Sequence, residues 1–167
     1  MDISKLKEGL FDKILFCTDF SKNADLAFDY AIYAARRHPG STLYLLHVIP
    51  EPEAQFWKTY LYEVDGIDEK ARQDIDARIA EVYRPRVPEE VHLEVVIRIG
   101  RDYVKILEFA EEANVDLIVI GRQGRSSWGR VLFGSVMEKV TRKAQCAVML
   151  IPLSAASEHA DSSPDSV

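Results

Sequence analysis

Short apolar runs alternate with longer amphipathic segments along this chain, and this alternation limits most strongly what the chain can fold into. The runs have the length of β-strands, and between them apolar residues recur at the spacing of α-helices. The predicted strands span residues 13–17, 43–48, 91–98, 117–120 and 147–151. Strands that alternate with helices in this way predict a parallel sheet with helices on both faces and right-handed crossovers. We therefore expect a single three-layer α/β/α domain with a Rossmann-like, five-stranded parallel sheet.

The segments between the strands also carry the signals that begin and end helices. The first helical stripe starts near Ala24 and stops at Pro39-Gly40. The second must end before Pro85, because the residue that precedes a proline disfavours helical backbone. Residues 103–110 form a third stripe, and a fourth helix is expected from Gly134 onward. Each predicted strand except the last is thus followed by a helix.

The character of each run indicates its place in the sheet. Residues 13–17 and 117–120 are uninterrupted apolar runs, which predicts central strands buried on both faces. Residues 91–98 alternate between apolar and polar side chains, which predicts an edge strand. Ligands of such sheets bind beyond the carboxyl ends of the strands, where the strand order reverses. The loops that follow residues 17 and 120 are therefore where we expect a site.

Charge and composition exclude several classes of protein. The formal net charge is −6, which argues against non-specific nucleic-acid binding, since that needs a large basic surface. No apolar run approaches the ~20 residues that a membrane span needs, and residues 1–10 lack the apolar core of a secretory signal. Cys17 and Cys146 are expected at opposite ends of the sheet, as free thiols. We therefore expect a cytoplasmic protein with neither a nucleic-acid nor a membrane partner.

The segment between the strand at 117–120 and the fourth helix carries the strongest functional signal. It contains Gly121, Gly124 and Gly134, and glycine lets the backbone approach a ligand closely. It ends at a helix amino terminus, whose free N–H groups and partial positive charge favour phosphate. The only charged residues within 117–137 are Arg122, Arg125 and Arg130. Together these features predict a phosphate site.

Structural roles could also explain parts of this segment. Ser135, with Glu138 three residues later, forms a capping box, which alone accounts for the serine. Gly121 and Gly124 could serve only as turn residues. Other phosphate loops fit less well, because no G-x-G-x-x-G follows the first strand and the lysine of a P-loop is missing.

The spacing of these residues matches a known motif. Gly121-x₂-Gly124, nine residues, then Gly134-Ser135 fit the pattern G-x₂-G-x₉-G-(S/T), and with it the chain resembles the ATP-binding universal stress proteins. The similarity extends over residues 11–152. Further stretches that look like the family are 47–48, 116–121 and 133–136. The resemblance implies the strand order 3-2-1-4-5 of the adenine nucleotide alpha hydrolase-like fold.

The resemblance also implies roles for individual residues. It places the ribose near Asp19, the adenine on the Val48 backbone and Thr18 in the same cleft. The residues implied at the triphosphate are Gly121, Arg122, Gly124, Arg125, Gly134, Ser135 and Val136. Mg²⁺ would be held by the phosphates, with Asp19 as a further candidate through water. Asp19 could instead cap the first helix or form an Asx turn.

One departure from the family concerns the end of the third strand. Family members often carry a small residue or proline just after the glycine there, whereas Gly100 is followed by Arg101-Asp102-Tyr103. Tyr103 could narrow the cleft, which leaves the identity of the ligand more open than its class. His47 and Cys17 fit packed residues better than ligands.

Three functions remain open from the sequence. The first is a stress-response regulator or nucleotide-dependent switch that binds ATP, ADP or AMP. At most slow ATP hydrolysis or autophosphorylation is expected of it, since no nucleophile–base pair, catalytic carboxylate pair or metal cluster accompanies the loop. The second is a phosphoryl-transfer signalling domain, for which Asp19 is present but the ends of the third and fourth strands offer no acceptor aspartate. The third is a protein-interaction module that has lost nucleotide binding, against which the intact glycine motif argues.

The domain is expected over residues 1–153, and two segments do not fit the strand–helix repeat. Residues 50–67 form a long connection that could be a lid, a partner surface or a short extra helix. Residues 154–167 are rich in serine, alanine and aspartate, which predicts a disordered tail. Residues 147–151 would form an uncharged edge strand, and pairing with its own copy predicts a homodimer. The sequence identifies no protein partner.

Overall fold

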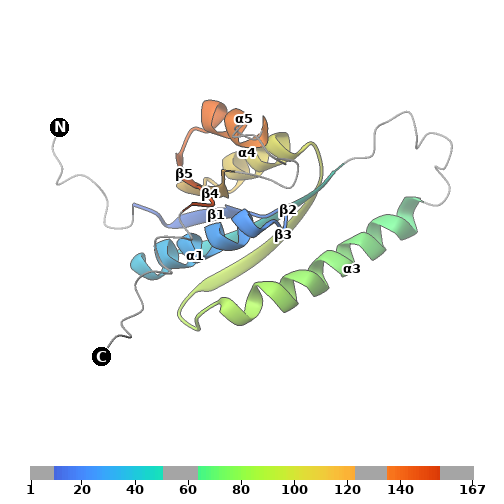
Figure 1. Cartoon of the computed structure of the whole chain (residues 1–167), viewed down its shortest axis with the longest axis horizontal. Helices are drawn as coiled ribbons and strands as arrows, with labels where there is room; N and C mark the ends of the chain where they lie inside the picture. The colour runs from blue at the N-terminus through green and yellow to red at the C-terminus, as the bar shows by residue number, and fades with distance from the viewer. Residues whose placement is uncertain (1–9, 51–63, 123–134, 155–167) are drawn as a thin grey trace.

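The computed structural model describes residues 10–50, 64–122 and 135–154, without the side chains of residues 64–68 (Figure 1). Each predicted strand is present. In chain order the elements are β1 (Lys13–Cys17), α1 (Lys22–Arg37), β2 (Thr42–Pro50), α3 (Val64–Val82), the 3₁₀ turn η2 (Arg84–Arg86), β3 (His92–Gly100), α4 (Asp102–Glu112), β4 (Leu117–Gly121), α5 (Ser135–Lys143) and β5 (Ala147–Ile151).

The strands form one five-stranded parallel sheet in the order β3-β2-β1-β4-β5. This confirms the predicted fold class, strand order and edge position of β3. The central β1 is almost wholly buried because both of its faces are covered, which explains why its sequence is an unbroken apolar run. β3 lies at the edge, and several of its side chains are partly exposed, as its alternating pattern predicts.

Helices cover the sheet in two layers, with α1 and α3 on one face and α4 and α5 on the other (Figure 1). Each layer buries its own apolar core. On the α1 side the rings of Phe16, Phe28 and Tyr83 pack together, with centroids 4.7–5.6 Å apart. On the opposite side Ile106 and Phe109 of α4 join residues of β1 and β4. Both faces of the sheet are thus covered by helices, so a site formed by loops would lie at the carboxyl ends of the strands.

A few boundaries differ from those expected. β2 and β3 extend to Pro50 and Gly100, beyond the predicted ends, because the two strands pair along their whole length. α3 begins at Val64, so the last residues of the expected 50–67 connection are helical. The rest of that connection, residues 51–63, and the expected tail from 155 onward lie outside the described residues.

The cysteines behave as the sequence predicts. Cys17 ends β1 and is buried, Cys146 precedes β5 and is half-buried, and both are free thiols. Burial is the main cause that raises the pKa of each thiol, so neither is a thiolate at neutral pH. In the part of the chain that the structure describes, no helix is long and apolar enough to span a membrane.

The start of α1 offers a test of how this fold is held. Ser21 is the N-cap, and its Oγ accepts a hydrogen bond from the Ala24 N–H at 3.2 Å. We predict that Ser21→Ala lowers the free energy of unfolding by about 1 kcal/mol, because that N–H loses its acceptor, whereas Ser21→Gly costs only roughly a few tenths. Urea denaturation followed by circular dichroism measures both changes. Equal losses in the two variants would contradict the capping role.

Candidate functional site

At the carboxyl end of the sheet, which we call its carboxyl edge, β1 ends before its neighbours β2 and β4. Pairing of β1 with β2 ends at Cys17 and Leu46. β2 continues beside β3 as far as Pro50, and β4 continues beside β5 to Gly121. The backbone of β2 from His47 onward therefore has no β1 strand beside it. This is the reversal point of the strand order, where ligands of parallel sheets bind.

The turn that follows β1 is built by its own side chains. The Thr18 N–H donates to the Leu46 carbonyl at 3.0 Å and prolongs the sheet by one bond. The Asp19 Oδ1 accepts the Ser21 N–H at 2.9 Å, which is an Asx turn. Of the two structural roles that the sequence allowed for Asp19, an Asx turn or a helix cap, it has the first. Ser21, and not Asp19, caps α1. The structure places Thr18 and Asp19 together at the predicted edge.

A buried chain of hydrogen bonds fixes Thr18. The Phe20 N–H donates to the Thr18 hydroxyl at 2.9 Å. The Thr18 and Tyr83 hydroxyl oxygens lie 2.6 Å apart, and the Tyr83 hydroxyl donates to Asp25 at 2.9 Å. Since Tyr83 gives its proton to a carboxylate, the Thr18 hydroxyl donates to Tyr83. Burial is the main cause that raises the pKa of Tyr83. The phenol therefore stays neutral, and the hydrogen bonds run from Thr18 to Tyr83 to Asp25.

Phe20 follows in a backbone conformation that few side chains adopt. Its φ of 60° lies in the left-handed region, which disfavours residues with a Cβ. The ring is held between three neighbours, with its centroid 4.8 Å from that of His47, 5.9 Å from that of Tyr83 and 4.3 Å from the Arg78 guanidinium carbon. These contacts come from β2, from α3 and from Tyr83, which directly follows α3. No local pattern in the sequence predicts a role for Phe20, Tyr83 or Arg78 here, because the residues in contact lie far apart along the chain.

His47 is a packed residue, as predicted. Its Nδ1 lies 2.8 Å from the Thr18 carbonyl oxygen, so Nδ1 carries the proton and donates. Burial lowers the pKa of His47 below its ordinary value, and the carbonyl and the nearby carboxylates of Asp102 and Asp19 only partly oppose this shift. Burial likewise raises the pKa of Asp102, in the first turn of α4, while His47 lowers it. Imidazole and carboxylates thus face one another at this edge.

Gly121, at the end of β4, lies where a side chain would be crowded. A Cβ there would lie 3.0 Å from the Asn23 side chain and 3.1 Å from its backbone, closer than side chains normally approach. Asn23 is buried in the first turn of α1, and its Nδ2 donates to the Ile151 carbonyl at 2.8 Å. The Arg122 N–H donates to the same carbonyl at 2.9 Å. Gly121 therefore brings β4, β5 and the start of α1 into contact.

Arg122, the last described residue before position 135, carries a side-chain donor that no group in the described residues accepts from. Its side-chain Nε is buried without a partner, alone in this respect among side-chain nitrogens and oxygens in residues 10–50, 64–122 and 135–154. Leaving a buried donor unpaired costs about 1–3 kcal/mol. An anion beside Arg122 would accept this bond. The residues at this edge therefore fit a ligand that carries phosphate.

The remaining predicted residues are placed in part. Val48 lies on the extension of β2, opposite Arg98 of β3. Ser135 and Val136 lie in α5, and the described part of this helix begins at Ser135, so the capping box stays a prediction. Glu138, the other half of that box, lies 3.5 Å from Arg142. Gly124, Arg125 and Gly134 lie outside the described residues. In the described ranges no group of acidic, histidine and cysteine side chains could hold a metal ion.

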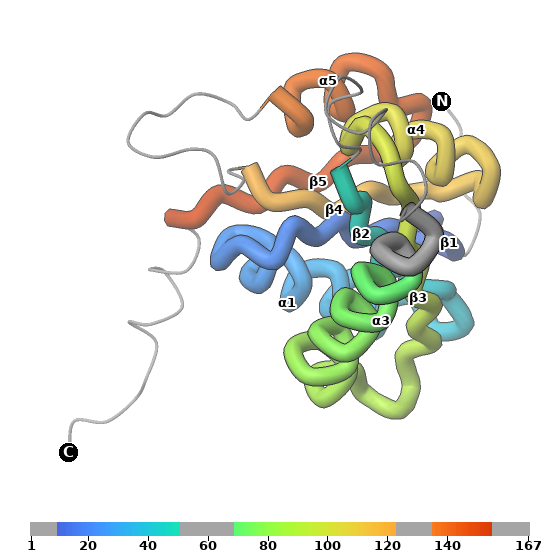
Figure 2. Tube along the Cα trace, turned by 90° about the vertical axis from the view of Figure 1, so that its right-hand side faces the viewer, coloured from blue at the N-terminus to red at the C-terminus, as the bar shows by residue number. Residues whose placement is uncertain are grey.

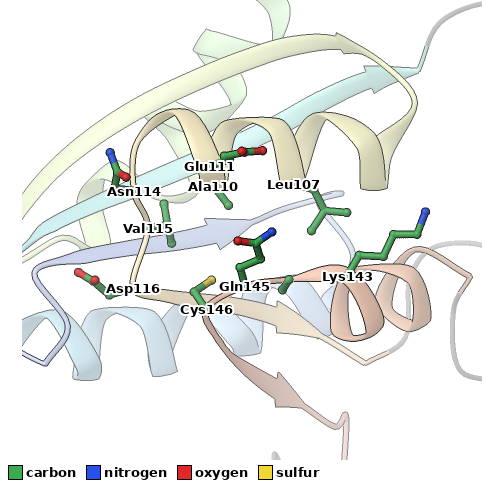
Figure 3. A pocket seen from close by; sticks show the side chains of 10 residues that line it. Leu107, Ala110, Glu111, Asn114, Val115, Asp116, Lys143, Gln145 and Cys146 are labelled. Atoms are coloured by element: carbon green, nitrogen blue, oxygen red, sulfur yellow. The ribbon is translucent and has the colours of Figure 1, made fainter.

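A cavity of about 320 Å³ lies elsewhere, between α4 and α5 at the amino ends of β4 and β5 (Figure 3). Asn114, Asp116 and Cys146 line it. Asp116 accepts the Asp12 and Lys13 N–H groups, at 3.1 and 2.9 Å, and so serves the fold. Because this cavity is at the opposite end of the sheet from Thr18 and Arg122, it does not belong to the predicted site.

Comparison with known proteins shows what the chain is similar to. The sequence profile described as the universal stress protein family matches residues 10–152. Universal stress protein MJ0577 of Methanocaldococcus jannaschii is 28% identical over 155 residues, which cover 85% of this chain and 95% of that protein. A solved structure of MJ0577 has a TM-score of 0.69 at 26% identity and covers 86% of this chain and 96% of that one.

Two more distant solved structures share the fold and are complexes with nucleotides. One is a universal stress protein in complex with cAMP, at 19% identity and a TM-score of 0.54, covering 85% of this chain and 97% of that one. The other is the universal stress protein from Archaeoglobus fulgidus in complex with dAMP, at 23% identity and a TM-score of 0.55, covering 85% and 98%. At these identities the likeness concerns the fold alone.

The hydrogen-bond chain at Thr18 can be tested by removing one hydroxyl. We predict that Tyr83→Phe lowers the free energy of unfolding by about 1–3 kcal/mol, because the buried Thr18 hydroxyl loses its acceptor. Tyr33→Phe is the matched control, since the Tyr33 hydroxyl accepts only from Arg37 at the surface and its loss should cost less than about 0.5 kcal/mol. Guanidinium denaturation measures both. A Tyr83→Phe loss no larger than the control would show that the chain does not stabilise the turn.

Proposed function

This chain belongs to the universal stress protein family, and from that premise we propose that it binds an adenine nucleotide at the carboxyl edge of its sheet. The observation that most supports this is the buried, unpaired Nε of Arg122. Arg122 directly follows Gly121, the glycine that begins the G-x₂-G-x₉-G-(S/T) motif. Gly121 ends β4, and ligands of parallel sheets bind beyond such strand ends. The cAMP and dAMP complexes of family members agree with an adenine nucleotide as the ligand class.

The proposed ligand is ATP, and each end of the site has its own residues. The Val48 backbone receives the adenine, since β2 runs past the end of β1 there. Asp19 accepts hydrogen bonds from the ribose hydroxyls. The glycine motif and the arginines hold the phosphates, through Gly121, Arg122, Gly124, Arg125, Gly134, Ser135 and Val136. Mg²⁺ is bound mainly by the phosphates, as a hard cation prefers oxygen ligands.

The proposed role is that of a nucleotide-dependent switch in a stress response, with turnover that is slow or absent. Two polar side chains that could otherwise act in catalysis, Thr18 and His47, already have protein partners. Thr18 donates to Tyr83, and His47 donates to the Thr18 carbonyl. A general base must be within hydrogen-bond reach of the proton that it takes up, and these groups are held by the fold. We also propose a cytosolic setting, in which free thiols are stable.

Binding can be tested on protein that has been unfolded, freed of nucleotide and refolded. We predict that calorimetry with magnesium detects ATP binding, and that Arg122→Met weakens it about tenfold, or about 1.4 kcal/mol. The same variant should not lower stability, because the Nε that it removes is unpaired in the free protein. Arg36→Met is the control, since Arg36 pairs with Glu90 at 2.9 Å on the surface.

The outcomes separate the candidate functions. No heat from ATP, ADP or AMP at millimolar levels would remove nucleotide binding and leave a protein-interaction module. If Arg122→Met and Arg36→Met weaken binding equally, the phosphates do not bind beside Arg122. Stoichiometric labelling by a small phosphodonor, lost in Asp19→Ala, would instead favour a phosphoryl-transfer signalling domain.

We further propose a homodimer that forms through β5. This strand is at the edge of the sheet, and its sequence, Ala147–Ile151, has no charge to prevent pairing with a copy. Val148 and its neighbours are only half-buried within one chain. Antiparallel pairing across a two-fold axis would cover them.

The dimer is tested by a charge on the edge strand. We predict that Val148→Lys shifts the mass in solution from dimer to monomer, because like charges would meet across the two-fold axis. His92→Lys puts the same charge on β3, the opposite edge, and should leave the mass unchanged. Light scattering measures the mass and circular dichroism checks the fold. An unchanged mass for folded Val148→Lys would place the interface elsewhere.

A further inference from the structure

Three cationic side chains gather around Tyr103, at the start of α4. The Nζ of Lys139 and the Nζ of Lys143, both on α5, lie 4.6 and 5.5 Å from the centre of the Tyr103 ring. Arg101, the N-cap residue of α4, interacts with the Tyr103 hydroxyl. We name Arg101, Lys139 and Lys143 the cationic cluster. The cluster lies where α4 and α5 run side by side (Figure 2).

Asp102, between Arg101 and Tyr103 in the sequence, interacts with His47, and three carboxylates farther along α4 and α5 are paired with other cations. On α4, Glu108 pairs with Lys105 and Glu112 pairs with Arg98, each at 2.7 Å. On α5, Glu138 lies 3.5 Å from Arg142. No member of the cationic cluster has an ion pair with a carboxylate among the described residues. The cluster is therefore a local concentration of positive charge on a chain whose net charge is −6.

The Tyr103 hydroxyl responds to this charge. Its pKa is lowered from the ordinary value, first by the Arg101 guanidinium at the hydroxyl and then by the charges of Arg101, Lys139 and Lys143. A phenol whose ionised form is favoured lies in a positive potential. An anion that approached the same place would be attracted for the same reason.

The cluster lies at the end of the sheet that holds the proposed site. Arg101 directly follows Gly100, which pairs with Pro50 at the carboxyl end of β2. Lys139 is one helical turn from Ser135, the first residue of α5, and so lies on the same side of that helix. Figure 3 shows the Lys143 side chain extending toward the amino-terminal end of α4, away from Asn114 and Asp116. The charged groups of all three cations thus lie around Tyr103 in the first turn of α4, while Lys143 also lines the cavity at the amino ends of β4 and β5.

We propose that the cationic cluster extends the phosphate subsite and makes this chain prefer a nucleoside triphosphate to a monophosphate. This rests on the proposed nucleotide binding. Each further phosphate adds negative charge and reaches farther from the ribose, so the cluster attracts a triphosphate more than it attracts AMP. The Tyr103 ring holds the two lysine side chains in place by cation–π contact.

The test compares affinities for MgATP and for AMP in paired variants. Lys139→Gln and Arg142→Gln remove the same charge from the same helix, but only Lys139 lies over Tyr103, whereas Arg142 is paired with Glu138. We expect Lys139→Gln to weaken MgATP binding about tenfold and AMP binding less than about twofold, and Arg142→Gln to change neither by more than about twofold. Calorimetry on nucleotide-free protein measures all six affinities.

A second pair of variants tests how the lysines are held. Tyr103→Phe keeps the ring and should keep the preference for MgATP, while Tyr103→Ala removes the ring and should reduce that preference. If Lys139→Gln leaves the ratio of MgATP to AMP affinity unchanged while the wild type still binds MgATP, the role proposed for the cationic cluster is wrong and the proposed nucleotide binding stands. Absence of binding by any adenine nucleotide to the wild type would overturn the proposed function and the cluster with it.

Discussion

The early end of β1 is the constraint on which the rest of this site depends. Ligands of an open parallel sheet bind beyond the carboxyl ends of its strands, where the strand order reverses. Here β2 and β4 both continue past Cys17, and the chain must leave the sheet within a single turn. Thr18, Asp19 and Ser21 make that turn with hydrogen bonds of their own, so the turn needs no ligand to form.

The turn is stable because a distant helix supports it. The left-handed backbone of Phe20 costs roughly 1–2 kcal/mol, and ring contacts with His47, Tyr83 and Arg78 offset this cost. Arg78 lies in the last turns of α3, and Tyr83 directly follows that helix, before η2. The carboxyl end of α3 therefore supports the turn that follows β1.

The sequence predicts the sheet because burial leaves a pattern along the chain, whereas contacts between distant residues leave none. Uninterrupted apolar runs in β1 and β4 and alternation in β3 follow from how many faces of each strand are covered. The Thr18–Tyr83 bond joins residues 65 positions apart, and no periodicity signals it. Gly121 was recognised for its place in a motif, but the structure adds a reason that the sequence cannot supply, its close approach to Asn23.

Stability and binding make opposite demands at this edge, and the residues divide accordingly. Asn23, Thr18 and Tyr83 are buried with their hydrogen bonds formed, so they stabilise the fold whether or not a ligand is bound. Arg122 keeps a buried donor without a partner, and the cationic cluster keeps positive charges together without a carboxylate among the described residues. Each of these arrangements raises the free energy of the unliganded protein. An anion would lower it at both places, so the free energy of binding includes relief of costs that the folded chain already carries.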